Sequence, residues 1–491
     1  MAGKKIGRGL IVAGIIGITL SFLIAVLFTP NATSRSLQIL IIEISGIVIL
    51  FGIWLTRTEA NLRTSPGEQT YNPVVQLMNV PIIVWVLLGF LLVYVLLFIL
   101  PVFLNPGRQM IYLTGYIPNL NPIGNDLRVM VDLIKGWATG DQSPYSVQFY
   151  PPLTYIVFAP LLLIQDPSNL YRLFTLFTFV SYCLLTLLLP LKIVDKKYLS
   201  LVLLLFVTGL FSYGFQFELE RGQYNVFTFL LCMTSIYIFH YHPKYRLLAY
   251  LLFSLSVQLK LYPAIFIVMF VDDWRDWKNI VLRFAGLGLF NLLLFFVMGF
   301  QTFWDFMSSV TTQVVNPSWI GVWNHSISSF VSMLKQDGFG LAGLESLRVL
   351  RRNEVWIEGS LILVFVLFFL FALVLFHLRR KTGLDPYLLL TCTIGALILP
   401  ISYDYTLSIL VVPVLLLLAA ENETNNTAYR SFSILLILGI SAVYFAILTP
   451  YNYRPYFLNN SFPLLFVLLI LVTISNFVRY KSGTMQPATN G

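Results

Sequence analysis

Residues 119–153, NLNPIGNDLRVMVDLIKGWATGDQSPYSVQFYPPL, form a polar segment in a chain that is otherwise mostly apolar. Within this segment, Asn125 to Trp137 has the pattern of an amphipathic helix, because apolar side chains recur at i, i+3, i+4 and i+7 and charged ones form a separate stripe. Such a helix is expected to lie flat at the water–lipid boundary. Asp126 falls in its first turn, so its carboxylate would lie at headgroup depth, as would the phosphate of a membrane-embedded substrate. An equally good interpretation is that Asp126 only complements the helix dipole behind an Asn125 cap.

The composition outside this segment indicates a polytopic membrane protein. Of the 491 residues, 58% are hydrophobic and 11% are charged, and the mean hydropathy is +0.81. A soluble domain is typically about a quarter charged. The net charge of +9 fits cytoplasmic Lys and Arg that set the topology, rather than a nucleic-acid partner. Cys183, Cys232 and Cys392 lie in apolar runs, so buried thiols are expected, and no metal-ligand spacing occurs.

The distribution of Lys and Arg predicts about 14 spans with both termini in the cytoplasm. Residues 1–78 are expected to hold two additional N-terminal helices, 9–29 and 37–56, and a cytoplasmic linker. Residues 79–480 would form the catalytic membrane domain, with extracytoplasmic loops at 105–150 and 301–356, and 481–491 a short cytoplasmic tail. The further spans are expected at 80–104, 168–190, 198–216, 224–241, a hairpin within 247–270, 279–299, 357–378, 386–400, 405–419, 430–448 and 460–478.

Two apolar runs do not fit a simple crossing. The run that follows Tyr150, from Pro151 to Ile164, has only about 14 residues, roughly 20 Å of helix against a hydrocarbon core of about 30 Å. It is interpreted as re-entrant or interfacial. The run 247–270 is broken at Lys260-Leu261-Tyr262-Pro263, where Pro263 removes a backbone donor. A hairpin there places Lys260 near the outer side, whereas a single kinked span would invert the topology of everything that follows.

Five unusual segments are expected to converge on the outer side, and together they suit a reaction on a lipid-linked phosphate. A carboxylate can deprotonate an acceptor hydroxyl, and two cations can bind a phosphate leaving group. The segments are Asp126 with its helix, Tyr150-Pro151-Pro152, Arg221 to Asn225, Lys260 to Pro263, and Asn324-His325-Ser326. Plain alternatives remain open: Lys260 as a snorkelling side chain, Arg221 as a partner of Glu218 or Glu220, Gly222 as a turn residue, His325 as an ordinary hydrogen-bonding residue, and Asp404 as a turn or cap residue.

These segments resemble glycosyltransferase family 87 in their order and residues over roughly 80–480. The matching motifs are Pro144-Tyr145 followed by Phe149-Tyr150-Pro151-Pro152-Leu153, then Gly222-Gln223-Tyr224-Asn225, Lys260-Leu261-Tyr262-Pro263, Asn324-His325-Ser326, and the helix with Asp126. The resemblance implies a GT-C fold enzyme that takes a sugar from a polyprenyl-phosphate donor, without metal, cofactor or nucleotide sugar. Mannosyltransferases are its best understood members. The chain departs from the family where His325 replaces a common Gln, and where Tyr405-Thr406 follow Asp404 in place of a frequent His.

The resemblance also implies residue roles. Asp126 is the expected general base, and Arg221 and Lys260 are expected to bind the donor phosphate. The residues expected to contact substrate are Tyr150, Gln223, Asn225, Tyr262, Asn324, His325, Tyr403 and Asp404. The expected activity is transfer of mannose, or another hexose or pentose, to a lipid or glycan acceptor at the outer face of a prokaryotic plasma membrane.

Two rival functions are retained. The first is a ligase or polymerase of lipid-linked glycans, which belongs to the same reaction class. The second is a flippase or transporter, which would show similarly broken helices. The sequence has no visible internal repeat, and its unusual residues fall in outer loops rather than in the middle of spans.

Overall fold

The computed structural model describes residues 9–10, 12–13, 16–17, 89, 91–92, 94–104, 117, 123–139, 145, 150–315, 321, 323–336, 353–379, 383–398, 402–422, 427–448 and 460–484. The chain divides into two groups, Met1–Tyr112 with Ser168–Leu173, and Leu113–Pro167 with Phe174–Gly491. The second group carries all the expected site residues. The helix expected at 37–56, the linker to residue 78 and the tail beyond 484 lie outside the described residues, as does most of 9–29.

The regular elements in the described ranges are helices, and an isolated antiparallel bridge joins Asn324 to Tyr403. The helices up to residue 241 are η1 (Val95–Ile99), α5 (Leu100–Leu104), α7 (Asn125–Thr139), α8 (Pro152–Phe158), η2 (Ala159–Leu163), α9 (Pro167–Cys183), η3 (Leu184–Leu188), α10 (Pro190–Ile193), η4 (Lys196–Tyr198), α11 (Leu199–Leu210), α12 (Tyr213–Arg221) and α13 (Asn225–Tyr241). Those that follow are η5 (Pro243–Tyr245), α14 (Arg246–Leu259), η6 (Tyr262–Met269), α15 (Trp277–Leu294), α16 (Phe300–Val315), α17 (Ile327–Gln336), α19 (Glu354–Arg379), α20 (Pro386–Ile398), η8 (Asp404–Leu410), α21 (Val411–Asn422), α22 (Thr427–Ile447) and α23 (Phe462–Thr484).

Several of these helices are long and apolar enough to cross a membrane, so the chain is a membrane protein built from helices. Among the described residues, five helical segments meet this condition, or six if one bent pair counts as a span. They are Pro167–Ile193, Trp277–Leu294, Glu354–Arg379, Asp404–Glu421 and Phe462–Lys481, and the bent pair is Lys196–Leu210 with Tyr213–Arg221. Other expected spans are shorter here, such as Asn225–Tyr241 and Pro386–Ile398. The total of about 14 spans stays a prediction.

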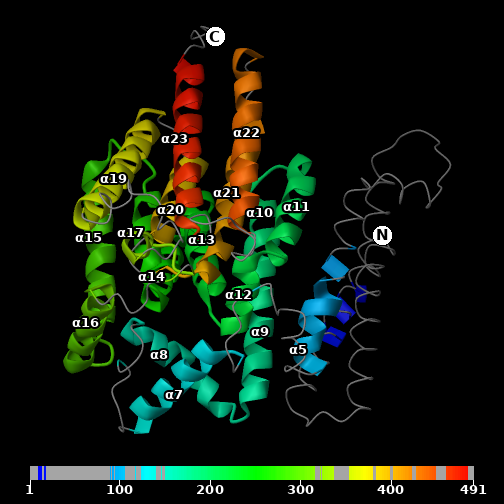
Figure 1. Ribbon diagram of the computed structural model, residues 1–491, viewed down its shortest axis with the longest axis vertical. Helices are drawn as coiled ribbons and strands as arrows, with labels where there is room; N and C mark the ends of the chain where they lie inside the picture. The colour runs from blue at the N-terminus through cyan, green and yellow to red at the C-terminus, as the bar shows by residue number, and fades with distance from the viewer. Residues whose placement is uncertain are drawn as a thin grey trace, which may run out of the picture. The chain divides into compact units, whose positions relative to one another are not determined.

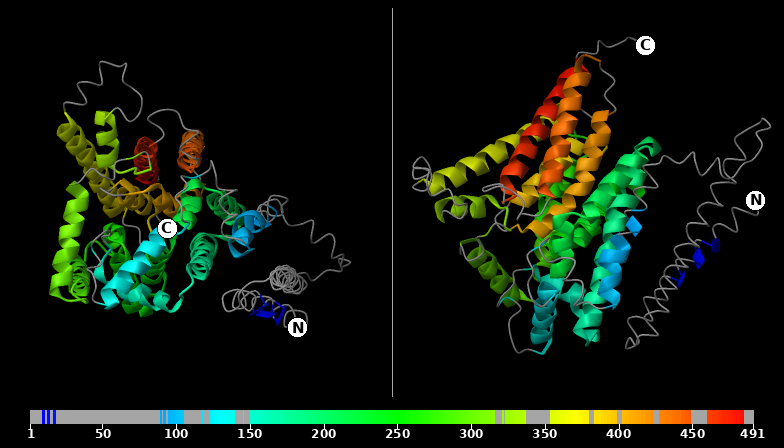
Figure 2. Two further views of the ribbon diagram at one scale, coloured as in Figure 1. Left: turned by 60° about the horizontal axis from the view of Figure 1, so that its bottom comes forward. Right: turned by 45° about the vertical axis from the view of Figure 1, so that its right-hand side comes forward.

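The centre of the second group is formed by α20 and by η8 with α21. Every residue from Tyr387 to Ile398 is buried, and α20 packs against α19, α21, α23 and η6. The helices α22 and α23 lie side by side next to this centre (Figures 1 and 2). Helices that are apolar on all sides in this way are enclosed by other helices rather than by water.

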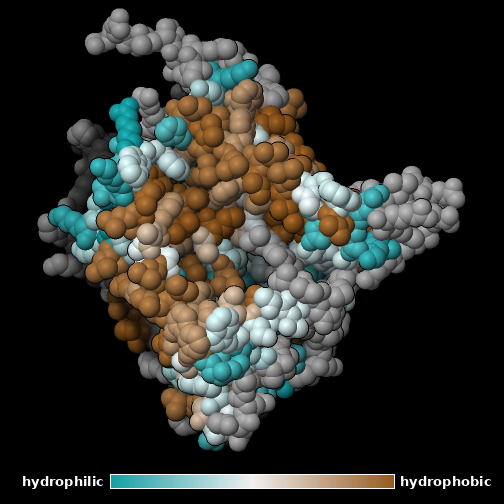
Figure 3. Space-filling model, turned by 90° about the vertical axis from the view of Figure 1, so that its left-hand side faces the viewer, coloured by the Kyte–Doolittle hydropathy of each residue, from teal (hydrophilic) through white to brown (hydrophobic). Residues whose placement is uncertain are grey.

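An apolar outer face surrounds this centre and fits contact with lipid. On α15 and α19, the side chains of Leu282, Leu293 and Leu363 are 71%, 60% and 58% exposed. Figure 3, which views the molecule from the side of these helices, shows a broad hydrophobic area, with hydrophilic residues gathered toward its margins. Exposed leucines over several helix turns are costly in water but favourable against acyl chains.

The expected single helix at 198–216 is wrong. The segment 198–216 is not one straight span, because the chain bends by 50° between α11 and α12. Ser212 begins the second helix, since its side-chain oxygen accepts a hydrogen bond from the backbone N–H of Phe215 at 3.2 Å. As a result Glu218, Glu220 and Arg221 lie on a helix, whereas the sequence suggested an outer loop.

The expected break at Lys260 is confirmed, and the run after Tyr150 is as short as expected, while its re-entrant or interfacial position stays a prediction. The helices α8 and η2 together cover only Pro152–Leu163, and α14 ends at Leu259, after which Lys260 has an extended backbone (φ −150°, ψ 145°). Packing of α7 against α8, η2 and α12 gathers these short helices at one end of the second group (Figure 1). The region expected as an outer loop, 301–356, contains the helices α16 and α17.

Candidate active site

The helix α7 presents Asp126 at its first turn. Leu127, Met130 and Ile134 are almost completely buried, so the apolar stripe found in the sequence is confirmed. It faces α8, η2 and α12 of the same chain, rather than lipid. The pattern shows that one face is apolar but not what covers it. Gly124 fixes the start of the helix, since its N–H donates to the Glu220 carbonyl at 2.7 Å.

A glycine turn between α12 and α13 brings the next residues to Asp126. Gly222 has φ 67° and ψ 43°, a left-handed conformation that ends helices and strongly favours glycine. The turn is closed by the Gln223 N–H, which donates to the Glu218 carbonyl at 3.0 Å. A Cβ on Gly222 would lie 2.8 Å from Leu127 Cβ, so a side chain here would push α7 away. The glycine therefore serves both the turn and the approach of α7.

Asp126 lies in a polar cluster made of Asp126, Tyr150, Arg221, Gln223 and Lys260, here called the Asp126 cluster. Gln223 Nε2 donates to Asp126 Oδ2 at 2.7 Å and to the Tyr150 hydroxyl at 3.1 Å. Arg221 Nη1 lies 3.5 Å from Asp126 Oδ1. The side chains of Asp126 and Arg221 remain 22% and 16% exposed. A molecule entering from solvent or from the interface could therefore reach both.

Lys260 completes this cluster from the break after α14. Its Nζ donates to Gln223 Oε1 at 2.8 Å. Three tyrosine rings surround the ammonium group, with centroids 5.3 Å away for Tyr150, 4.7 Å for Tyr224 and 5.5 Å for Tyr405. Ring faces attract cations, so Lys260 is held by aromatic side chains and an amide rather than extended into water. The snorkelling interpretation does not describe this arrangement.

The electrostatic balance of Lys260 is set by burial and two carboxylates. Burial lowers its pKa to about 8, and the negative charges of Glu218 and Asp126 oppose this shift. Glu218 is fully buried and accepts hydrogen bonds from the Val226 N–H at 2.8 Å and the Ser408 hydroxyl at 2.6 Å. It thereby fixes the start of α13 against η8. Of the two pairings considered for Arg221, the one with Glu220 is confirmed, since Arg221 Nε lies 3.3 Å from Glu220 Oε2. Among the described residues, Arg221 forms no ion pair with Glu218.

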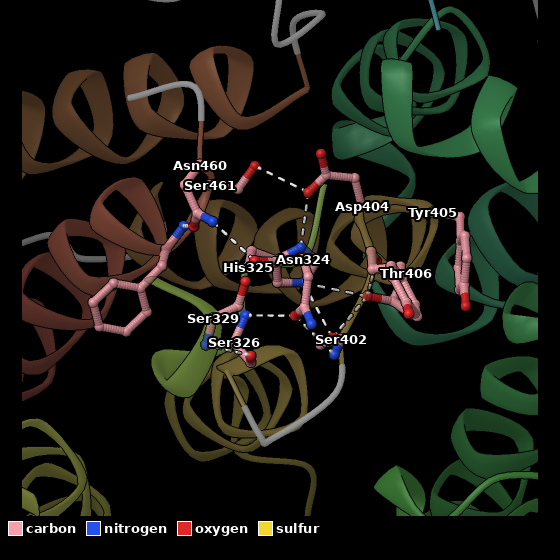
Figure 4. A network of polar contacts seen from close by, with 12 residues as sticks. Asn324, His325, Ser326, Ser329, Ser402, Asp404, Tyr405, Thr406, Asn460 and Ser461 are labelled. Atoms are coloured by element: carbon pink, nitrogen blue, oxygen red, sulfur yellow. Dashed lines mark hydrogen bonds and ion pairs between the residues drawn. The ribbon is translucent and has the colours of Figure 1, made fainter. Parts of the chain in front are cut away.

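A second polar group is built around His325 and is called the His325 cluster; it contains Asn324, His325, Ser402, Asp404, Thr406 and Asn460 (Figure 4). His325 Nδ1 lies 2.9 Å from Asp404 Oδ1, and both side chains are fully buried. The other ring nitrogen, Nε2, faces the Ser402 hydroxyl at 3.1 Å and the Thr406 hydroxyl at 3.3 Å. Because a carboxylate only accepts, the proton of the imidazole is assigned to Nδ1.

Backbone pairing holds the two loops of the His325 cluster together. The His325 N–H donates to the Ser402 carbonyl and the Asp404 N–H to the Trp323 carbonyl, each at 2.9 Å. Asn460 Nδ2 donates to the Asn324 carbonyl at 2.8 Å. His325 and Asp404 are thus buried and bound to each other, and the buried Asn324 binds Ser402 and Asn460, which fits a role in holding the loops.

Tyr403 and Tyr405 connect the two clusters. Their ring centroids lie 5.4 Å apart, and the Tyr405 ring also faces Lys260. Burial and then the Asp126 carboxylate raise the pKa of Tyr403 above its usual value, which reflects how near Tyr403 is to Asp126. Because the His325 cluster fixes the backbone on both sides of Tyr403, it also positions this tyrosine beside the Asp126 cluster.

The remaining expected site residues are Tyr262 and Asn225, which contact each other. The Tyr262 hydroxyl donates to the Asn225 carbonyl at 3.0 Å. The Asn225 side chain is fully buried, and neither of its polar atoms has a partner among the described residues. A buried amide without partners is unusual. It leaves Asn225 able to bind a polar group that the chain itself does not supply.

Besides Ser402 and Thr406, four residues in or beside the two clusters were not expected as site residues from the sequence. Tyr224 and Tyr405 could have been proposed, since they lie within the Gly-Gln-Tyr-Asn and Tyr-Asp-Tyr segments. Glu218 was considered only as a partner for Arg221. Asn460 carries no sequence signal of a site, and its contact with Asn324 spans 136 positions.

Within the described residues, no group of three or more His, Cys, Asp or Glu side chains is arranged to hold a metal ion. No curated protein and no solved structure shows a significant match to the chain. The family model of glycosyltransferase family 87 matches residues 149–402, which is more than half of the sequence. The match begins one residue before Tyr150 and extends through Arg221, Gln223, Lys260 and His325. On this match, the chain belongs to glycosyltransferase family 87.

Proposed function

We propose that this glycosyltransferase takes a sugar from a polyprenyl-phosphate donor and transfers it to a lipid or glycan acceptor on the extracytoplasmic face of a prokaryotic plasma membrane. The sugar is mannose or another hexose or pentose. The proposal rests chiefly on one observation: Asp126, Arg221 and Lys260, which come from three separate segments, lie in a single partly exposed cluster. Gln223 links Asp126 to Lys260, and Arg221 lies beside Asp126. A base and two phosphate-binding cations are the groups that such a transfer needs.

The chemistry assigns a role to each charged group. Asp126 takes the proton of the acceptor hydroxyl, whose oxygen forms a bond to the anomeric carbon of the donor. The bond between that carbon and the phosphate oxygen breaks, and its electron pair leaves on the polyprenyl phosphate. Lys260 and Arg221 stabilise the charge that develops on this leaving group. The acceptor attacks from the side opposite the phosphate, so the configuration at the anomeric carbon is inverted.

The surrounding residues would bind and orient the substrates. Tyr150 and Tyr403 border Asp126, while Asn225 offers a buried amide that has no partner in the part of the chain that the structure describes. The tyrosine rings around Lys260 exclude water from the ammonium group, and exclusion of water strengthens its attraction to a phosphate. Asn324, His325 and Asp404 would act through Tyr403, whose backbone they hold in place.

Purified protein in detergent tests the transfer directly. Incubated with a prenyl-phosphate sugar labelled in its sugar and with candidate lipid acceptors, the protein should form a labelled glycolipid and release prenyl phosphate. A flippase, which the bend between α11 and α12 would also fit, needs two compartments and would form no product in detergent. A ligase or polymerase would transfer a preassembled glycan but not a single sugar. Absence of labelled product with every single-sugar donor contradicts the proposed function.

The proposed orientation has its own test. Single cysteines at Lys196 and Ser318 are treated in intact cells with a thiol reagent that does not cross the membrane. Ser318 lies in the loop proposed to face outward and should react, whereas Lys196 lies in a cluster of basic residues proposed to face the cytoplasm and should not. Labelling of Lys196 alone would show the opposite orientation.

A further inference from the structure

Gln223 lies at the centre of the Asp126 cluster, and all the polar atoms of its side chain are engaged. Its Oε1 accepts from Lys260 Nζ at 2.8 Å. Its Nε2 donates to Asp126 Oδ2 at 2.7 Å and to the Tyr150 hydroxyl at 3.1 Å. The side chain is 2% exposed. An amide with this many short contacts has one fixed position and cannot easily rotate away.

The chemistry of the two ends allows only one orientation of this amide. An ammonium group has protons to donate and nothing to accept with, whereas an ionised carboxylate only accepts. The oxygen of Gln223 must therefore face Lys260 and its nitrogen must face Asp126. Of the other side chains of similar length, Glu lacks the donor and Met lacks both groups. The pairing needs a residue with a donor and an acceptor at the end of a chain of this length.

The amide also keeps the cation and the carboxylate apart. Within the described residues, Lys260 and Asp126 form no direct ion pair, and each instead binds Gln223. A direct pair in this half-buried site would hold Lys260 on Asp126, so the ammonium would be less available to a phosphate and the carboxylate less able to take a proton. Linked through the amide, the two groups stay at a fixed separation.

We propose that Gln223 is a positioning residue of the transfer reaction: it orients Asp126 by holding Oδ2, leaves Oδ1 toward the acceptor, and holds Lys260 toward the donor phosphate. This inference rests on the proposed function. Among the described residues, the contact recorded for Oδ1 is Arg221 Nη1, at a long 3.5 Å. A donor phosphate would attract Arg221 and thereby free Oδ1 to take the acceptor proton. Gln223 thus gives the two carboxylate oxygens different roles: Oδ2 accepts its hydrogen bond, and Oδ1 takes the acceptor proton.

The charged and titratable groups near the Gln223 amide come from several elements. They are Asp126 on α7, Tyr150 before α8, Glu218, Glu220 and Arg221 on α12, Tyr224 beside it in the turn, Lys260 after α14, and Tyr403 and Tyr405 at the start of η8. The two variants below leave all of these groups in place. They change only what position 223 offers to Lys260 and to Asp126.

The test compares Gln223→Glu with Gln223→Met. The Glu side chain still accepts from Lys260, so the donor KM should stay within about threefold of the wild-type value. It cannot donate to Asp126 and adds a like charge beside it, so the acid limb of the rate–pH profile should move up by about one unit. The Met variant loses both contacts, so kcat should fall about 10²-fold, as for a misplaced reacting group, and the donor KM should rise as well.

Gln258→Met serves as the matched control. Gln258 is another buried glutamine, on α14 just before Lys260, and its Nε2 donates to the Asn291 carbonyl at 3.0 Å, away from the Asp126 cluster. Its replacement should lower thermal stability while leaving the pH profile and the donor KM unchanged. This separates a general loss of packing from a loss of positioning.

The outcomes distinguish this inference from the function on which it rests. If the wild-type protein transfers sugar and both Gln223 variants keep its kcat and pH profile, Gln223 positions nothing, although the proposed function stands. The same conclusion follows if the Glu and Met variants lose activity equally with an unmoved acid limb. If the wild-type protein transfers no sugar from any prenyl-phosphate donor, the proposed function fails and this inference fails with it.

Discussion

Replacing Asp126 with asparagine keeps the shape of the side chain but removes its ability to take a proton. The asparagine oxygen can still accept from Gln223 Nε2, which now binds Oδ2 at 2.7 Å. The amide nitrogen would then face Arg221 Nη1, now 3.5 Å from Oδ1, and the ion pair would be lost. Because both side chains are partly exposed, that pair contributes at most about 1 kcal/mol to folding. The variant is therefore expected to fold.

The expected loss of activity is much larger than the loss of stability. A general base contributes about 10²- to 10⁴-fold to the rate, which corresponds to roughly 2.7–5.4 kcal/mol of transition-state stabilisation. If Asp126 served only the helix dipole of α7, its replacement would cost about 0.3–1 kcal/mol of stability and would leave catalysis largely intact. The two explanations differ by at least one order of magnitude in rate.

The assay is label transfer by purified protein, run beside donor binding and size-exclusion chromatography. Asp132→Asn is the matched control, since Asp132 is exposed on the same helix. Asp141→Asn, in the same polar segment but outside the described residues, is a second control. An inactive Asp126→Asn that binds donor and elutes as a single peak, with active controls, supports the base. An active Asp126→Asn would remove it from this role, and so would a variant that loses folding and donor binding together.

Three further predictions concern the same site. Arg221→Ala and Lys260→Ala should each weaken donor use by about 2–5 kcal/mol, as for removing one partner of a desolvated charge pair; donor kinetics like those of the wild type would reduce both to structural roles. Because burial lowers the pKa of Lys260 to about 8, the fraction able to bind phosphate falls as pH rises through that value, so kcat/KM for the donor should decline above pH 8. The alkaline limb of the kcat–pH profile should lie at higher pH than that of kcat/KM, since a bound phosphate favours the charged form of Lys260. Alkaline limbs at the same pH would contradict this prediction. Gly222→Ala should lower the melting temperature and the activity together. The left-handed backbone alone should reduce the free energy of unfolding by about 1–2 kcal/mol, with a further cost because the new Cβ would lie 2.8 Å from Leu127 Cβ. An alanine variant as stable as the wild type would show that α7 can shift freely.

Much of the membrane architecture follows from the sequence alone, because it depends on local properties. Helix length, apolar composition and the proline at Pro263 are local, and they predicted a membrane protein of helices with a break at Lys260. The amphipathic pattern of Asn125 to Trp137 predicted α7 and three of its buried residues, Leu127, Met130 and Ile134. The short motifs, read in order, also pointed to the glycosyltransferase family that the chain matches.

The tertiary structure decided what lies next to what. No local signal says that the stripe of α7 packs against the chain's own helices, that α11 and α12 bend at Ser212, or that Arg221 lies on a helix. The contact of Gln223 with Asp126 spans 97 positions and that of His325 with Asp404 spans 79. Such contacts depend on how several helices pack at once, and a single sequence does not encode them as a readable pattern. The sequence thus named most chemical groups of the candidate site, and only packing made Gln223 the link between Lys260 and Asp126.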